Sequence, residues 1–187
     1  MSISFFIRRI MEALRIYRIE DKYIHYLKSR DDRVQYNKNK RRPYVGIVLY
    51  VGKYKYFVPM ESPKPNHTNI KSGNHLLKLN DGQLGILGFN NMLPVPETAL
   101  ISFNIDAEED KKYAELLKRQ ASYINKNKAN IYSHASKTYY NAIKGNNKFL
   151  NSICCNFKEL EKACNKYNPN YKKQTHSSTR LLVREYD

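Results

Sequence analysis

The loop that follows the central apolar run of the sequence holds the side chains best suited to chemistry. It reads Pro59-Met60-Glu61-Ser62-Pro63-Lys64-Pro65, so a hydroxyl and an ammonium group stand close together on a turn stiffened by prolines. Lys64 can neutralise charge that builds on phosphate oxygens, and Ser62 can donate a hydrogen bond to such an oxygen. The plain alternative is a solvated loop in which Ser62 only initiates a turn.

RNA is a substrate for which these few groups suffice, because it supplies its own nucleophile. The ribose 2′-OH attacks the adjacent phosphorus in line with the departing 5′ oxygen, so the protein positions the chain, helps to move protons and stabilises charge. A tyrosine hydroxyl can position the ribose or relay a proton. This route needs no metal ion. We predict no metal site and no cofactor, since the histidines are scattered without ligand spacing: His25, His67, His75, His134 and His176.

Positive charge lies toward the two ends of the 187-residue sequence, whose net charge is +16. Residues 1–44 hold twelve Lys and Arg against five Asp and Glu, residues 45–110 five against seven, and residues 111–187 sixteen against five. Such charge attracts polyanions. Tyrosines, whose rings can stack on unpaired bases, interleave with these cations: Tyr36 and Tyr44 around residues 38–42, and Tyr132, Tyr139 and Tyr140 near Lys137. We predict contact with single-stranded or folded RNA in preference to duplex DNA.

The cysteines and the N-terminal residues indicate that the protein stays in the reducing cytoplasm. Cys154, Cys155 and Cys164 are an odd set with two adjacent members, which favours core thiols in a reducing compartment over a disulfide scaffold. The short apolar stretch 2–7 precedes Arg8-Arg9, the reverse of a secretory signal, and no run approaches the roughly 20 apolar residues of a membrane span. We predict a cytoplasmic protein without membrane contact. It forms a single domain over 1–187, with 1–10 as an extension and 168–187 as a polar tail.

Strand patterns come first in the sequence and helical patterns follow, which predicts an α+β fold. Expected strands lie at 14–19, 44–51, 54–58, 76–79, 83–89 and 100–105, with a hairpin turn at Gly52-Lys53 and a loop over 59–75. A brief helix follows Asp21. Longer helices are expected from a capping box at Asp106 to about 127, over 129–144, and from 147 to 167. The strands are expected to form an antiparallel sheet that curls toward a barrel, and residues 181–183 to add an edge strand.

The order and spacing of several motifs resemble the ToxN/AbiQ family of type III toxin–antitoxin endoribonucleases over roughly residues 14–167. The similar stretches are Tyr44-Val45-Gly46-Ile47-Val48-Leu49, Ser62-Pro63-Lys64 and Asn90-Asn91-Met92-Leu93-Pro94-Val95-Pro96, with shorter ones at 17–19, 23–27, 55–59, 84–85 and 149–161. The resemblance implies a strongly twisted antiparallel sheet or partial barrel of the MazF/Kid type. Its surrounding helices would lie mostly in the C-terminal half.

The resemblance also implies an activity and a partner. The activity is metal-independent RNA cleavage, often at A-rich sequences, that leaves a 2′,3′-cyclic phosphate on mRNA and on the antitoxin precursor. The partner is a small pseudoknot antitoxin RNA that the toxin processes and binds, in an assembly with several toxin copies. The biological role is phage defence by abortive infection. Two alternatives are a non-catalytic RNA-binding protein and a MazF-like ribonuclease held by a protein antitoxin.

By its motifs the resemblance places Tyr44, Ser62 and Lys64 at active-site positions. Arg42, Lys53 and Lys55 are expected nearby as RNA contacts. The family has Thr or Ser before the Ser-Pro-Lys turn, whereas this chain has Glu61. Either that hydroxyl is dispensable, or Glu61 takes a proton-transfer role.

Overall fold

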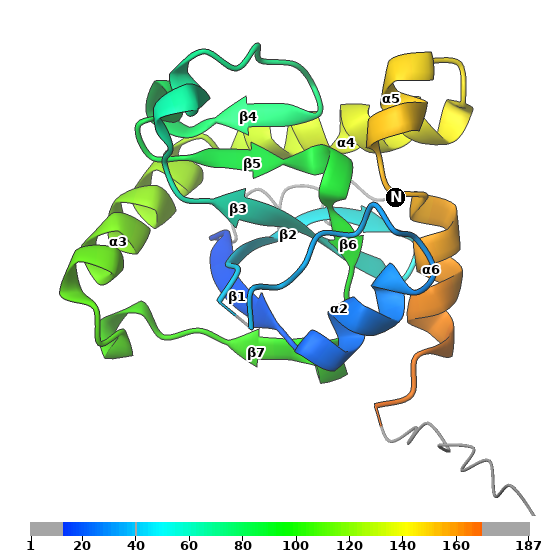
Figure 1. Ribbon diagram of the computed structural model, residues 1–187, viewed down its shortest axis with the longest axis horizontal. Helices are drawn as coiled ribbons and strands as arrows, with labels where there is room; N and C mark the ends of the chain where they lie inside the picture. The colour runs from blue at the N-terminus through cyan, green and yellow to red at the C-terminus, as the bar shows by residue number, and fades with distance from the viewer. Residues whose placement is uncertain (1–12, 40, 170–187) are drawn as a thin grey trace, which may run out of the picture.

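A strongly twisted antiparallel sheet forms the centre of the computed structural model, which describes residues 13–39 and 41–169 (Figure 1). The strand order is β4-β5-β3-β2-β1-β7, and β6 also pairs with β3. The strands are β1 Arg15–Ile19, β2 Tyr44–Val51, β3 Tyr54–Glu61, β4 Leu76–Lys78, β5 Ile86–Gly88, β6 Leu93–Pro94 and β7 Leu100–Ser102. In the described part of the chain this path runs from β4 to β7 without closing, so the antiparallel sheet is confirmed and its description as a partial barrel stays a prediction.

The β2–β3 hairpin organises the sheet, because β3 pairs with three other strands. The hairpin turns at Gly52-Lys53 as predicted, and Gly52 has the positive φ of +55° that the first residue of such a turn requires. On its other side, β3 pairs with β6 near Tyr56 and with β5 at Glu61. The predicted end of this strand at residue 58 was wrong. The strand continues through Pro59 to Glu61. Pro59 has no N–H to donate, but the N–H of the next residue, Met60, donates to Pro43 O at 2.9 Å, so the pairing of the two strands continues past the proline.

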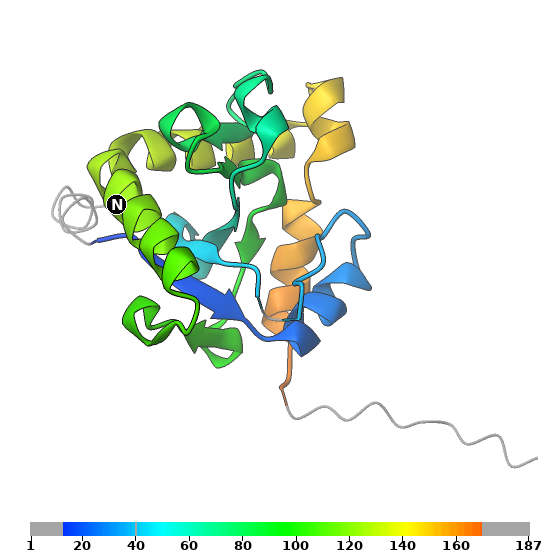
Figure 2. The same ribbon diagram turned by 60° about the vertical axis from the view of Figure 1, so that its left-hand side comes forward.

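The helices lie around the sheet, with α3 at one side and α5 and α6 at the other (Figures 1 and 2). Their bounds are α2 Asp21–Lys28, α3 Lys111–Lys126, α4 Lys128–Lys144, α5 Lys148–Ile153 and α6 Phe157–Lys166. Short 3-10 turns cover Pro65–Thr68, Leu79–Gly82, Phe89–Asn91, Glu97–Ala99 and Ile105–Ala107. The α+β prediction is confirmed. No helix within 13–39 or 41–169 has the length and apolar character that a membrane crossing needs.

Capping side chains explain where the predicted helices were wrong. The continuous helix expected from 147 is two helices, because Asn147 caps α5 at the Leu150 N–H (3.0 Å) and Asn156 caps α6 at the Glu159 N–H (3.2 Å). The helix α3 is capped by Asp110, whose carboxylate accepts from the Tyr113 N–H at 3.1 Å. Asp106, the predicted cap, instead pairs with Lys118 at 2.7 Å.

Two smaller differences concern strands. The expected strands at 76–79 and 83–89 are shorter, because 3-10 turns take the adjoining residues. Residues 93–94, expected as irregular chain, form β6. The predicted edge strand at 181–183 and the extension at 1–10 lie outside the described residues.

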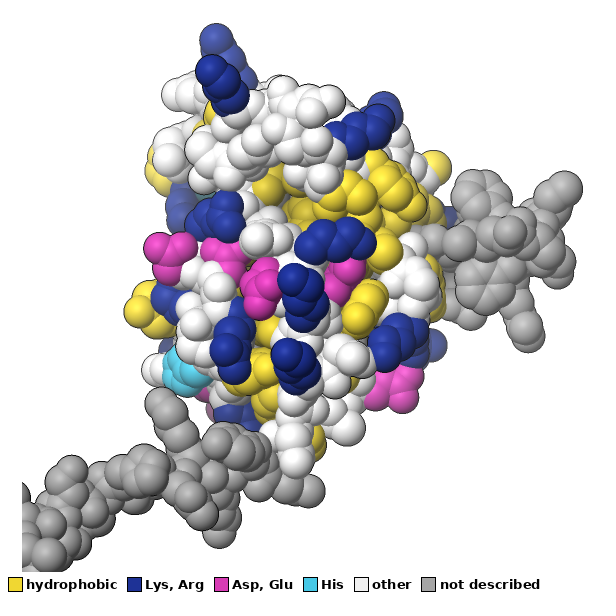
Figure 3. Space-filling view, turned by 90° about the vertical axis from the view of Figure 1, so that its right-hand side faces the viewer, with side chains coloured by type: hydrophobic (Ala, Val, Ile, Leu, Met, Phe, Trp, Pro, Cys, Tyr) yellow, Lys and Arg dark blue, Asp and Glu magenta, His cyan; other side chains and the backbone are white. Residues whose placement is uncertain are grey.

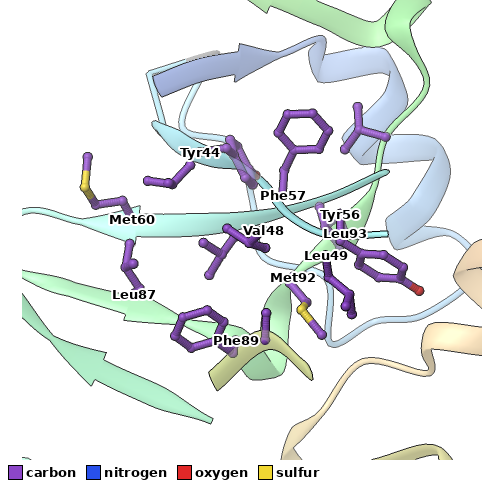
Figure 4. Close-up of a cluster of buried hydrophobic side chains, with 14 of the residues drawn as sticks. Tyr44, Val48, Leu49, Tyr56, Phe57, Met60, Leu87, Phe89, Met92 and Leu93 are labelled. Atoms are coloured by element: carbon purple, nitrogen blue, oxygen red, sulfur yellow. The ribbon is translucent and has the colours of Figure 1, made fainter. Parts of the chain in front are cut away.

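Tyrosines build much of the core, although the sequence suggested an aromatic surface. Tyr23, Tyr44, Tyr56 and Tyr139 are among the largest fully buried side chains. Figure 4 shows Tyr44 and Phe57 on the side of β2 and β3 that faces α2, with Val48, Leu87 and Phe89 on the other side. Of the tyrosines that interleave with cations, Tyr36 and Tyr140 are exposed.

One buried carboxylate satisfies two of these phenols. Glu161 of α6 accepts hydrogen bonds on Oε1 from Tyr56 (2.9 Å) and Tyr139 (2.6 Å), and on Oε2 from Lys158 (3.0 Å). Glu161 is 6% exposed. The ionised group is therefore paired and hydrogen-bonded, which is the condition for its burial. This network ties α4 and α6 to β3.

We expect Glu161→Ala to lower the free energy of unfolding by about 3 kcal/mol, because it leaves two buried phenols and an ammonium group without their hydrogen-bond acceptor. Urea unfolding at pH 7 measures the change. Glu159→Ala is the matched control on the same helix. Among the residues that the structure describes, its side chain pairs only with Lys162, at the surface (3.3 Å), so we expect a loss of about 0.5 kcal/mol. Equal losses in the two variants would contradict this account of the network.

Candidate active site

A cleft of about 510 Å³ opens beside the end of β3. Figure 2 turns toward the viewer the side of the molecule on which α3 lies. The walls come from the end of β3, from the loop before β2, from β1 and from the start of α3. They comprise Met60, Glu61 and Ser62; Lys38, Arg41, Arg42 and Pro43; Arg18; and Glu108, Glu109, Asp110 and Tyr113. The cleft therefore gathers segments that lie far apart in the sequence.

Hydrogen bonds of the residues that follow it hold the turn with Ser62 and Lys64 in place. Both side chains are exposed, and the 3-10 turn that follows buries His67, whose backbone N–H donates to Lys64 O at 3.0 Å. Lys78 donates to Thr68 O at 3.0 Å and closes the far end of the loop. The predicted loop is thus a fixed platform that presents a hydroxyl and an ammonium group to solvent. Burial, with the nearby Lys64 charge, lowers the pKa of His67.

A glycine sets the position of this turn against the sheet. Gly85 has φ +96°, and a Cβ added there would lie 1.9 Å from Glu61 O and 3.2 Å from the Ser62 carbonyl carbon. Only a residue without a side chain lets the start of β5 approach the backbone of Glu61 and Ser62 this closely. Gly85 therefore has a structural role in the site.

Glu61 lies between the cationic side chains of Lys64 and Arg42. Lys64 Nζ donates to Glu61 Oε2 at 2.7 Å, and Arg42 lies 3.8 Å from Oε1. Burial alone would raise the pKa of Glu61, but Lys64, with Arg42 and Lys38, holds that pKa below its ordinary value. At neutral pH the carboxylate is ionised. It can accept a proton, and it cannot donate one.

Arg42 is the fixed cation of the group. Its side chain is 8% exposed, and its Nε donates to Tyr36 O at 2.9 Å. One terminal nitrogen is buried without a hydrogen-bond partner among the described residues, and it points toward the Glu61 carboxylate. A guanidinium that is anchored at Nε and faces the Glu61 carboxylate gives this end of the cleft a fixed positive charge.

The structure brings Ser62, Lys64, Glu61 and Arg42 together, and it places Tyr44 elsewhere. Tyr44 starts the strand next to them but is 1% exposed, with its ring in the core that faces α2 (Figure 4). Burial raises the pKa of its hydroxyl, although the Arg42 charge opposes the shift, so the phenol keeps its proton. The catalytic role of Tyr44 stays a prediction, made for a side chain that does not line the cleft.

Lys53 and Lys55, which were expected nearby, lie at the opposite end of the hairpin. Lys53 hydrogen-bonds to Asn165 and Lys55 pairs with Glu97, and both border a different cavity of about 370 Å³. Glu61 lies six positions after Lys55 along β3, about 20 Å at the usual rise of a strand. The expected proximity was wrong, because a hairpin puts its turn far from its strand ends. Their role as RNA contacts stays a prediction.

Sequence reasoning missed Arg18 and the acidic wall of the cleft. Arg18 pairs with Glu108 at 3.0 Å and lies over the Phe103 ring at 4.1 Å. Glu108, Glu109 and Asp110 precede α3, where negative charge favours the start of a helix. Apart from the loop after β3, the basic run at 38–42 was the one wall of the cleft with a recognisable signal in the sequence. A polyanion in this cleft would meet cations at the β3 end and repulsion at the α3 end.

Gly85→Ala should disturb the Ser62 turn, because it combines a strained φ with contact against backbone. We expect the free energy of unfolding to fall by about 3 kcal/mol. The matched control is Gly145→Ala, where φ is +71° but nothing lies within 4 Å of the added Cβ, so only about 1 kcal/mol should be lost. Urea unfolding of both variants gives the comparison. Similar losses would show that the close approach to Glu61 is unimportant.

Glu61→Gln should make unfolding less sensitive to acid. The pKa of Glu61 is depressed in the folded state, so its stabilising contribution is complete above the ordinary pKa of about 4.3 and is lost as the pH falls through the folded value. Urea unfolding at pH 7 and at pH 3 should show the variant less stable at pH 7 and similar to wild type at pH 3. Glu109→Gln, on the opposite wall, is the control. A difference between wild type and Glu61→Gln that is equal at both pH values would contradict the ion network.

Comparisons with known proteins place the chain in a family. A family model for the toxin ToxN of type III toxin–antitoxin systems matches residues 15–165. The endoribonuclease ToxN of Bacillus thuringiensis subsp. kurstaki is 31% identical over 158 residues, which cover 80% of this chain and 81% of that protein.

Two solved structures have the same fold. One belongs to a type III system in which a non-coding RNA pseudoknot selectively inhibits the toxin; it is 29% identical, with a TM-score of 0.74 over 83% of this chain and 98% of that one. The other is AbiQ, a lactococcal anti-phage endoribonuclease, 26% identical with a TM-score of 0.74 over 82% and 97%. The predicted ToxN/AbiQ resemblance is confirmed, whereas the likeness to MazF/Kid-type toxins stays a prediction. The chain belongs to the ToxN/AbiQ family of endoribonuclease toxins of type III toxin–antitoxin systems.

Proposed function

We propose that the cleft beside Ser62 cleaves RNA by internal transesterification without a metal ion, leaving a 2′,3′-cyclic phosphate. One observation carries the proposal: at the end of β3, an exposed ammonium group and an anchored guanidinium flank one ionised carboxylate, and the exposed hydroxyl of the next residue lines the same cleft. These groups match the needs of the reaction, which are phosphate binding, proton removal and stabilisation of charge.

The roles follow from the chemistry of each group. The Glu61 carboxylate takes the proton of the ribose 2′-OH, and the 2′ oxygen then forms its bond to phosphorus while the bond from phosphorus to the 5′ oxygen breaks. Arg42 and Lys64 offset the charge on the phosphate oxygens, and Ser62 donates a hydrogen bond to one of them. The departing 5′ oxygen takes a proton from the solvent side, where Lys64 is exposed.

Substrate binding would also activate the base. Lys64 and Arg42 hold the pKa of Glu61 down in the free protein. A phosphate that engages these cations draws them away from the carboxylate and adds a negative charge beside it, and both changes raise the pKa of Glu61. The carboxylate becomes a stronger base only when a phosphate is bound. Glu61 thereby replaces the hydroxyl that the family pattern has at this position.

The wider role that we propose is that of a toxin held by a small pseudoknot antitoxin RNA, in an assembly with several toxin copies, that acts in phage defence. Support comes from the RNA pseudoknot of one solved relative and the anti-phage activity of another. The net charge of +16 favours an RNA partner. On the face that bears α5 and α6, Lys and Arg are interspersed with several Asp and Glu (Figure 3).

We expect Ser62→Ala and Lys64→Met each to lower the cleavage rate by about 100-fold or more, the scale of losing one donor to a developing oxyanion. The assay uses purified protein, labelled transcripts and EDTA throughout. Binding is measured with a 2′-deoxy oligonucleotide, which cannot react, and should weaken by less than about tenfold. The matched controls are Ser72→Ala and Lys71→Met, which lie later in the same loop and outside the cleft.

Several results would overturn this function. If Lys64→Met weakens binding as much as cleavage, Lys64 only docks the RNA. If EDTA abolishes wild-type cleavage, the metal-free route is wrong. If the wild type leaves every transcript intact yet binds it, the alternative of a non-catalytic RNA-binding protein is correct.

A further inference from the structure

The loop that carries the proposed catalytic groups lies against a second turn, residues 79–85, which is called the support turn. The two segments are in contact at two places. Gly85 lies against the backbone of Glu61, and a Cβ added at Gly82 would lie 3.0 Å from the carbonyl carbon of His67. The contacts involve backbone on both sides, so neither segment can shift without the other.

Backbone hydrogen bonds make the support turn a single unit. The Leu84 N–H donates to Leu79 O at 3.0 Å, and the Leu79 N–H donates to Gly85 O at 2.9 Å. The Gly85 N–H donates to Gly82 O at 3.0 Å. A displacement at Leu84 is therefore transmitted to both contacts with the loop.

One side chain of α3 holds the support turn. Gln120 Nε2 donates to Leu84 O at 2.7 Å, and the Gln120 side chain is buried, with 1% of the residue exposed. Within residues 13–39 and 41–169, no other helix side chain hydrogen-bonds to the support turn. The position of the support turn relative to α3 thus depends on this bond and on apolar packing.

The buried amide of Gln120 makes only half of its hydrogen bonds. Leu84 O can only accept, so Nε2 is the amide atom that faces it. Gln120 Oε1 is buried without a partner in the described part of the chain. A buried acceptor without a donor is unfavourable. This cost offsets what the Leu84 bond contributes to stability, so the bond matters mainly for the geometry of the support turn.

The helix that carries Gln120 also forms the opposite wall of the cleft. Asp110 and Tyr113 line the cleft at the start of α3. Gln120 follows Tyr113 by seven positions, about 10 Å along the helix axis. Because the helix is continuous over this distance, the bond from Gln120 to Leu84 fixes one wall of the cleft relative to the other.

We propose that Gln120 is a positioning residue for RNA cleavage, which holds the support turn, and with it Glu61 and Ser62, at a fixed place relative to the α3 wall. The inference rests on the proposed function, which assigns Glu61 and Ser62 to the reaction. Gln120 does not line the cleft and acts only through the support turn. Without its bond, Lys64 still reaches a phosphate, because that side chain is long, exposed and flexible. The base and the hydrogen-bond donor lose the placement that the reaction requires.

The test is RNA cleavage by Gln120→Leu. We expect kcat to fall by about 10- to 100-fold, the scale of a displacement of about 1 Å in a catalytic site. KM, and the affinity for a 2′-deoxy oligonucleotide that cannot react, should change by less than about threefold. The urea midpoint should shift by less than about 0.5 M, because the variant exchanges one buried unpaired oxygen, Gln120 Oε1, for another, Leu84 O.

Two control variants separate position from stability. Ser122→Leu introduces the same side chain at an exposed position of α3 and should leave kcat unchanged. Glu161→Ala should lower the urea midpoint and still keep kcat, because Glu161 lies outside the cleft. The inference is overturned, and the proposed function stays intact, if Gln120→Leu keeps the wild-type kcat or loses affinity as much as kcat. An equal loss of kcat in Glu161→Ala overturns it as well.

Hydrogen exchange decides the inference without any cleavage. The His67 N–H donates to Lys64 O at 3.0 Å, where the support turn meets the loop. In Gln120→Leu this amide should exchange about tenfold faster than in the wild type. The reference is the Leu160 N–H of α6, which donates to Asn156 O at 3.0 Å and should keep its rate. An unchanged rate at His67 overturns the inference.

Failure of the proposed function gives a different result. In that case the wild type leaves every transcript intact, whatever Gln120→Leu does. The exchange rate at His67 then still shows whether Gln120 positions the loop.

Discussion

The ionised Glu61 carboxylate between Lys64 and Arg42 is the interaction on which the site depends. An exposed pair such as Lys64 and Glu61 contributes little to stability by itself, about 0–1 kcal/mol. Here it orients a long, exposed side chain next to a guanidinium that is already buried and anchored. The carboxylate occupies the charge environment that a phosphate would need. The free protein therefore already holds these cations around an anionic group.

The sheet makes this arrangement rigid. Glu61 is the last residue of β3 and pairs with Ile86 of β5. Strand β2 flanks β3 on the side opposite β5, and Arg42 lies two residues before the start of β2 at Tyr44. Gly85 lets β5 lie directly against the backbone at Glu61 and Ser62. Groups placed on strand ends are held more closely than groups on free loops. The loop contributes only Ser62 and Lys64, and the buried His67 anchors it.

The sequence predicts the parts of the site that are local and fails for those that depend on long-range packing. Ser62 and Lys64 were predicted together because they are neighbours in the sequence, and Arg42 was expected near them through the family resemblance. Tyr44 begins a nearly continuous apolar run, and such a run does not reveal which face a side chain takes. The acidic wall at the start of α3 reaches the cleft only through tertiary packing. The apolar stripe over 149–164 hid the break between α5 and α6, because its core contacts continue across the Asn156 cap.

An RNA-cleaving site must perform two tasks, which are to hold the phosphate and to choose the linkage that is cut. Phosphate contacts position a chain but carry no sequence information, so Lys64, Arg42 and Ser62 cannot by themselves choose where the chain is cut. Discrimination needs groups that read a base edge, and these must lie outside the cluster of cations around Glu61.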